Sequence, residues 1–238
     1  MTHRLPLLMI ALICANPAMS QDNALPEWRA AEEYAVAAST ADPTQVMTLI
    51  NGKADSTDNA WACASCHGEN GQGAQTIPRL SGLSVGYIVK QLHDYQSGTR
   101  QNNNMQYVVK TLDDSQMAAL GAYYSALDAP PAASPSLGGD LERGRVLALQ
   151  GDWNVDLPSC FSCHGPSGWG VQQAFPAIAG QDPAYIHAQL AAWKNGRRAN
   201  SPLGLMQSVS NALSDADMRA VSDYLATLPP PQRLTAPQ

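Results

Sequence analysis

Two boxes of the form Cys-x-x-Cys-His constrain this chain of 238 residues more than any other feature. The boxes span 63–67 and 160–164. Two thiols three residues apart on one turn can add to the two vinyl groups of a porphyrin, and the histidine that follows then lies under the iron as an axial ligand. One box would also suit half of a zinc site or a thioredoxin-like redox pair, whereas two boxes that both end in histidine favour c-type haem. We therefore expect two haem c groups, with Cys63, Cys66, Cys160 and Cys163 as thioether residues and His67 and His164 as iron ligands.

The first 20 residues have the pattern of a secretory signal peptide. Arg4 precedes an apolar stretch over 5–15, and small residues at the end of the segment suit cleavage before Gln21. The segment also holds Cys14, the fifth cysteine of the chain. The apolar stretch is shorter than the roughly 20 residues that a membrane span needs, and no later segment approaches that length. We expect a periplasmic protein with no transmembrane segment, and peripheral membrane association stays open.

The negative charge of the chain excludes some partners. The sequence has 14 Lys and Arg against 20 Asp and Glu, and loss of Arg4 with the signal peptide leaves 13 minus 20, or −7. Such a surface argues against nucleic acid and anionic lipid, which both select clustered basic residues. A redox protein with a basic docking patch fits better as a partner.

An internal repeat indicates two domains. An offset of 98 relates the segments that follow the two boxes, and it becomes 101 after a three-residue insertion. A Pro- and Gly-rich stretch over 128–139 suits a linker between the copies. We expect a signal peptide (1–20), an N-terminal extension (21–44), a first domain (45–134), a second domain (135–230) and a flexible tail (231–238). The offsets pair Pro78 with Pro176, Arg100 with Arg198, Met105 with Met206 and Met117 with Met218.

Helical periodicity dominates both copies, and no alternating run suggests a sheet. Capping boxes are predicted where Asp113 precedes Gln116 and where Ser214 precedes Asp217, at the start of the last helix of each copy. Other helices are expected from 84 and from 182 onward, before each box over 44–50 and 140–150, and over 27–38 in the extension. Met117 and Met218 fall on apolar stripes and are predicted to be core residues. The predicted fold class is all-α, with two tandem domains that each wrap one covalently bound haem.

Met105 and Met206 are the candidates for the second axial ligand of each iron. Both lie in polar loops between the middle and last helices, where a segment can fold over the distal face of a haem. Thioether ligation favours ferrous iron and raises the reduction potential. His93 and His187 are the other candidates, but they do not occupy equivalent positions in the two copies. We expect these two histidines on solvated helix faces.

Four further residues are candidate supports of the haems. Pro78 and Pro176 lie 11 and 12 residues after the box histidines, and their carbonyl groups can accept a hydrogen bond from the imidazole N–H. The alternative is that they are ordinary turn prolines. Arg100 and Arg198 are candidate partners of haem propionates, with exposed surface charge as the alternative.

With these motifs in place, the chain resembles the dihaem class I cytochromes c, and most specifically the cytochrome c4 group, over residues 45–228. The resemblance rests on the two boxes, on Pro-x-Leu-x-Gly at 78–82 and Pro-x-Ile-x-Gly at 176–180, on repeated Tyr-x-x-x-Gln-Leu and Gly-x-Arg patterns, and on the loop methionines. It implies two mostly helical haem domains with neighbouring haem edges and His–Met iron in both. The stretch 22–44 departs from the family pattern and leaves the docking surface open.

The resemblance also implies a function, which is electron transport without catalysis. The expected partners are a donor dehydrogenase or quinol-oxidising complex and a terminal oxidase. One alternative is a cytochrome subunit of a periplasmic dehydrogenase complex, attached through 22–44. Another is a dihaem peroxidase, which needs one open iron and is disfavoured by a candidate methionine in both copies. A thiosulfate-oxidising enzyme with a cysteine iron ligand is disfavoured too, because the boxes and the signal peptide account for all five cysteines.

Overall fold

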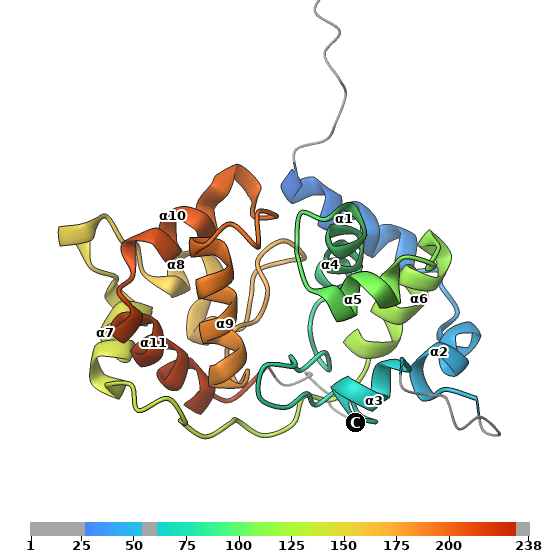
Figure 1. Cartoon of the computed structure of the whole chain (residues 1–238), viewed down its shortest axis with the longest axis horizontal. Helices are drawn as coiled ribbons and strands as arrows, with labels where there is room; N and C mark the ends of the chain where they lie inside the picture. Colours follow the sequence, from blue (N-terminus) through green and yellow to red (C-terminus); the bar gives the residue numbers. More distant parts are fainter. Residues whose placement is uncertain (1–26, 54–60, 232–238) are drawn as a thin grey trace, which may run out of the picture.

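The computed structural model describes residues 27–53 and 61–231, and within these ranges it consists of helices and loops with isolated β-bridges but no β-strand. Figure 1 shows two helical bodies side by side, joined by an extended segment. The predicted all-α fold with two tandem domains is confirmed. The predicted signal peptide and the tail beyond residue 231 lie outside the described residues.

The helices follow the same order in both domains after an additional helix at the start (Figure 1). Helix α1 (Glu27–Ala38) lies in the N-terminal extension, and η1 (Pro43–Val46) leads from it into the first domain, which comprises α2 (Met47–Asn51), α3 (Cys63–His67), α4 (Val85–Ser97), α5 (Asn103–Val109) and α6 (Asp114–Ser125). The second comprises α7 (Leu141–Gln150), η2 (Trp153–Val155), α8 (Cys160–His164), η3 (Pro166–Gly168), α9 (Pro183–Lys194), η4 (Pro202–Gly204), α10 (Leu205–Ala212) and α11 (Asp215–Thr227).

Side-chain caps fix where the last helix of each domain begins. Asp113 accepts a hydrogen bond from the backbone N–H of Gln116 at 2.8 Å, and the Ser214 hydroxyl accepts one from the N–H of Asp217 at 3.0 Å. The side chains of Gln116 and Asp217 accept in return from the backbone of the capping residue. Both predicted capping boxes are confirmed, and each satisfies amides that the first turn of a helix leaves without a partner.

Each domain has its own apolar core. In the first domain α4 packs against α6, and Met117 and Tyr124 of α6 are fully buried. In the second domain α11 packs against α7 and α9, and Met218 is 5% exposed. The predicted core role of both methionines is confirmed, and burying a side chain of this size contributes about 1.5–3 kcal/mol.

His93 and His187 are less exposed than predicted. His93 stacks on Tyr34 of α1 with ring centroids 4.5 Å apart, and 23% of its side chain is exposed. His187 lies 3.0 Å from a carboxylate oxygen of Asp215, with 27% of its side chain exposed. The prediction of solvated faces was wrong for His93 because α1 covers that side of α4, and the periodicity of α4 alone does not reveal a neighbouring helix.

The segment between the domains is held by one buried carboxylate. Asp223 of α11 is fully buried and accepts hydrogen bonds from the backbone N–H groups of Ser136 at 2.8 Å, Leu137 at 3.0 Å and Gly139 at 2.8 Å. Hydrogen bonds to a charged acceptor are stronger than those between neutral groups. The end of the Pro- and Gly-rich stretch is therefore fastened to the second domain.

Candidate haem sites

The box histidines face a proline carbonyl in both domains. The Nδ1 atom of His67 lies 3.0 Å from the carbonyl oxygen of Pro78, and that of His164 lies 2.8 Å from the carbonyl oxygen of Pro176. A carbonyl oxygen can only accept, so each contact requires the proton on Nδ1. This leaves the lone pair of Nε2 free to bind a metal, and the hydrogen bond orients the ring.

Burial keeps both imidazoles neutral. It lowers the pKa of His67 and of His164, and the hydrogen bond to the proline carbonyl offsets only part of that effect. The guanidinium of Arg100 lowers the pKa of His67 further, and that of Arg198 does the same for His164. A neutral imidazole is the form that ligates iron.

A cavity in the second domain brings the predicted ligands together. Its volume is about 210 Å³, and Cys160, Cys163, His164 and Met206 all line it. Residues of the first domain complete the wall, including Tyr87 and Gln91. The site is therefore bounded by both domains.

The candidate methionines lie in short helices rather than in loops. Met105 is the third residue of α5, because Asn102 accepts a hydrogen bond from its N–H at 3.1 Å and starts the helix there. Met206 is the second residue of α10, which follows a turn where Leu203 and Gly204 have φ of 54° and 66°. The predicted loop placement was wrong because these side-chain and turn contacts start a separate short helix before the last helix of each domain. Met105 packs against the core of the first domain, as does Cys63.

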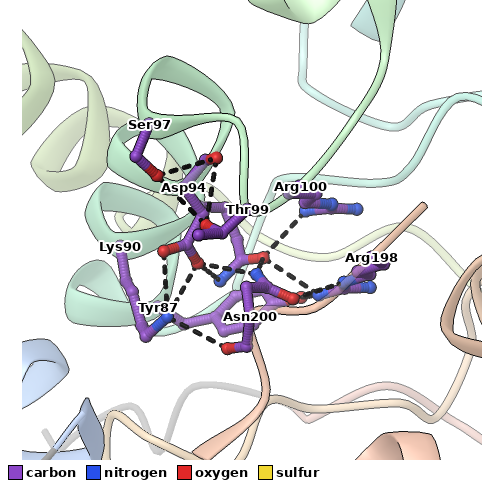
Figure 2. A network of polar contacts seen from close by, with 9 residues as sticks. Tyr87, Lys90, Asp94, Ser97, Thr99, Arg100, Arg198 and Asn200 are labelled. Atoms are coloured by element: carbon purple, nitrogen blue, oxygen red, sulfur yellow. Dashed lines mark hydrogen bonds and ion pairs between the residues drawn. The ribbon is translucent and has the colours of Figure 1, made fainter. Parts of the chain in front are cut away.

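Arg100 and Arg198 lie next to each other at the boundary between the domains, 4% and 3% exposed (Figure 2). Arg100 donates to Gln91 of its own domain and to Gln189 of the other, at 3.0 and 2.8 Å. Arg198 donates to the same two glutamine oxygens, each at 2.9 Å. Each arginine also donates to a tyrosine hydroxyl of the opposite domain, Arg100 to Tyr185 at 2.9 Å and Arg198 to Tyr87 at 3.2 Å. Exposed surface charge, the alternative considered for these arginines, is excluded.

The two guanidinium groups have neutral side-chain partners throughout the described residues. The carboxylate beside them, Asp94, is already paired with Lys90 at 2.7 Å and with the amide of Asn200 at 2.6 Å (Figure 2). Burial alone would raise the pKa of Tyr87, but Arg198 and Arg100 outweigh burial and lower it. Buried cations without a counter-charge are costly.

These groups fit a porphyrin that carries carboxylates. Propionates would neutralise the arginines, and the indole N–H of Trp193 offers a further donor, because it is buried without a protein partner and Trp193 lines the cavity. The guanidinium of Arg198 lies 3.8 Å above the Trp193 ring, and that of Arg100 lies 4.6 Å above the Tyr95 ring. The cofactor's acidic edge would thus meet matched sites in the two domains.

Sequence reasoning missed the residues that join the two arginines. The two tyrosines and two glutamines of the interface were used only as marks of the repeat. A usable signal was present, since each copy places a glutamine directly before a leucine that is buried in the core, and a polar residue next to a core position needs a hydrogen-bond partner if it is buried too. The four residues are Tyr87, Gln91, Tyr185 and Gln189.

Two helical domains, each with a Cys-x-x-Cys-His turn and a histidine oriented by a proline carbonyl, define a c-type cytochrome with two haem sites. The family model of cytochrome c matches residues 51–128 and 142–229. The chain belongs to the cytochrome c family, as a dihaem electron carrier of the cytochrome c4 group, and its two boxes attach two haem c groups covalently.

Similar proteins include electron carriers of thiosulfate oxidation. A thiosulfate dehydrogenase electron acceptor from Stutzerimonas stutzeri is 43% identical over 71% of this chain and 80% of its own length. Cytochrome c4 from Pseudomonas aeruginosa is 34% identical over 71% of this chain and 85% of its own length. The solved structure of a thiosulfate dehydrogenase from Marichromatium purpuratum is 39% identical with a TM-score of 0.72, over 79% of this chain and 40% of that longer one.

Proposed function

We propose that this cytochrome accepts electrons from a periplasmic thiosulfate dehydrogenase and passes them through its two haems to a further redox protein, such as a terminal oxidase. The observation that carries the proposal is its 43% identity to a protein named as the electron acceptor of such an enzyme. The solved thiosulfate dehydrogenase supports it, because 79% of this chain matches part of that structure. The proposal specifies the dehydrogenase-subunit alternative that the sequence left open.

The geometry of the interface suits a relay between two centres. Gln91 and Gln189 each accept hydrogen bonds from both arginines, so the two sites share one buried set of contacts. When bound, each haem supplies one-electron chemistry by cycling between ferric and ferrous iron. The interface residues hold the two haem-binding domains in one fixed relation, which limits reorganisation during transfer.

Met105 and Met206 support a carrier rather than a peroxidase. We propose that they close the distal sides of the two irons, so that neither site has a position open to a substrate. Met206 supports this by lining the same cavity as His164. A peroxidase would need one of these positions to be free.

Export to the periplasm belongs to the same proposal. It is supported by the signal-peptide pattern over 1–20 and by the requirement of c-type assembly for thiols outside the cytoplasm. In the part of the chain that the structure describes, none of the helices has the length and apolar character of a membrane span.

The direct test mixes the purified ferric protein with the thiosulfate dehydrogenase of Stutzerimonas stutzeri and thiosulfate. Absorbance in the haem bands should report two electrons taken up per chain, and thiosulfate without the dehydrogenase should give no reduction. If a small-molecule reductant reduces both haems but the dehydrogenase does not, the assigned partner is wrong while the carrier function stands. Turnover of hydrogen peroxide by the reduced protein would instead favour the peroxidase.

A further inference from the structure

Helix α1 in the N-terminal extension packs closely on the first domain. It lies against α4 and α6, and Ala31 and Ala38 are buried there. The closest approach is at Gly86 of α4, where a Cβ atom would lie 1.9 Å from the carbonyl oxygen of Ala31. Only glycine admits this contact. Tyr34 adds the stacking contact with His93.

The same helix also reaches the second domain. A carboxylate oxygen of Glu32 accepts a hydrogen bond from the backbone N–H of Gln173 at 3.1 Å. The side-chain oxygen of Gln173 in turn accepts one from the N–H of Gly86 at 2.8 Å. Ala31 lines the cavity of the second domain. Gln173 of the second domain is therefore held between α1 and α4, with one hydrogen bond to each helix.

Gln173 belongs to the loop that supports the second box histidine. Val171 and Phe175 close this loop through paired backbone hydrogen bonds of 2.9 and 3.3 Å. Phe175 meets the ring of His164 edge-on, with centroids 6.3 Å apart. The next residue is Pro176, whose carbonyl oxygen lies 2.8 Å from the Nδ1 atom of His164. One short segment thus links α1 to the iron-facing histidine of the other domain.

We propose that α1 is a cross-domain clamp in which Glu32 is a positioning residue for the second haem. It fixes the loop 171–175 and, through Phe175 and Pro176, the orientation and hydrogen bonding of His164. The inference rests on the proposed function in one respect, because it takes His164 as an axial ligand of a closed redox site. Partners of an axial histidine tune the potential of the iron, so the clamp acts on one haem of the two.

The first test compares Glu32→Ala with Glu33→Ala in the holoprotein. Glu33 lies on the same helix but is exposed, which makes it the matched control. Loss of a hydrogen bond to a carboxylate should speed deuterium exchange of the amides in 171–175 by about tenfold or more. One of the two midpoint potentials should shift in the Glu32 variant, and it should be the one that Met206→Ala also moves. Glu32→Gln retains an acceptor oxygen, so its deuterium exchange in 171–175 and its two midpoint potentials should match those of the wild type.

A second variant tests the packing without touching the carboxylate. Alanine is a better helix former than glycine, so Gly86→Ala would stabilise an α4 that had no neighbouring helix at this position. The clamp predicts the opposite, namely lower stability together with the same faster exchange and shifted potential. Stabilisation by this change would overturn the proposal.

The outcomes separate the clamp from the function on which it rests. If the wild type shows the far-red methionine–iron band at both haems, yet Glu32→Ala behaves like Glu33→Ala, the clamp is wrong and the carrier stands. If Glu32→Ala weakens binding of the dehydrogenase but leaves loop exchange and both potentials unchanged, the extension is a partner attachment instead. If the wild type lacks the band at either haem, the closed-site function itself fails.

Discussion

At the level of single residues, we propose that one methionine in each domain closes the distal side of the iron. Met206 lines the same cavity as His164, and Met105 occupies the corresponding place in the repeat. A methionine bound to ferric haem iron gives a weak far-red absorption band, and two such haems contribute equally to it. We predict that Met105→Ala and Met206→Ala each remove half of this band. Each variant should also lower one midpoint potential, because a thioether favours ferrous iron.

Optical titration of the two variants measures both effects. Met117→Leu is a suitable control, since that methionine is buried in the core and a volume-conserving change there should leave the band intact. A wild-type protein with the band at one haem only would contradict the claim that both irons carry a methionine ligand.

The buried arginines are expected to affect the midpoint potentials of the haems through their charge. A positive charge close to a haem disfavours ferric iron, and removing it leaves any propionate partner uncompensated. We therefore predict that Arg198→Met lowers the midpoint potential of the second haem. Arg197→Met is the matched control, because Arg197 is the exposed neighbour. Equal potentials in the two variants, measured by spectroelectrochemical titration, would contradict a role for Arg198 at the haem.

At the level of elements, Arg143 ties three segments of the second domain together. Its guanidinium, on α7, donates to Asp217 of α11 at 2.7 Å and to Asp152 before η2 at 2.8 Å. The hydrogen bond from Arg143 lowers the pKa of Asp152 below its ordinary value of 3.8. Partial burial alone would raise the pKa of Asp217, but hydrogen bonds from Arg143 and Ser214 outweigh it and lower the pKa.

These shifts predict how stability depends on pH. A carboxyl whose pKa is lowered by folding contributes stability above its unfolded pKa, and loses it as the pH falls through the folded value. The difference in unfolding free energy between wild type and Arg143→Met should therefore be constant above about pH 5 and shrink as the pH drops below 3.8. Urea denaturation at a series of pH values measures it. A difference that persists unchanged at low pH would assign the role of Arg143 to packing alone.

At the level of the whole molecule, a polar interface joins the two domains. Besides the paired arginines, Gln181 of the second domain accepts from the backbone N–H of Arg79 at 3.0 Å and donates to its carbonyl oxygen at 2.8 Å. The Arg79 guanidinium donates to the carbonyl oxygen of Ala179 at 3.1 Å. Burial lowers the pKa of Arg79 to about 10, which leaves it charged near neutral pH. The domains are thus coupled through backbone groups as well as through side chains.

We predict that the holoprotein unfolds in one calorimetric transition and that Gln181→Ala splits it into two. The substitution leaves a buried N–H and a buried carbonyl without partners, which costs about 3 kcal/mol at the interface. Gln101→Ala, at an exposed glutamine, should leave the transition unchanged. Two resolved transitions in the wild type would mean that the interface is too weak to couple the domains.

The sequence by itself determined the chemistry and the fold class. Thioether attachment depends on the local spacing Cys-x-x-Cys-His, and helix starts such as Asp113 with Gln116 depend on residues three apart, so both can be recognised without knowing the tertiary structure. The repeat likewise located matching residues in the two domains. The core positions of Met117 and Met218 followed from helical periodicity.

Only the tertiary structure decided how the two domains act together. The pairing of Arg100 with Gln189, and of Glu32 with Gln173, joins residues 89 and 141 positions apart in the chain, and no local pattern encodes such a contact. The cover of His93 by α1 and the closure of the second cavity by residues of the first domain have the same origin. The physical reason is that hydrogen bonding and burial across an interface depend on how whole helices pack against each other. Sequence periodicity shows which face of a single helix is apolar, but not which helix covers that face.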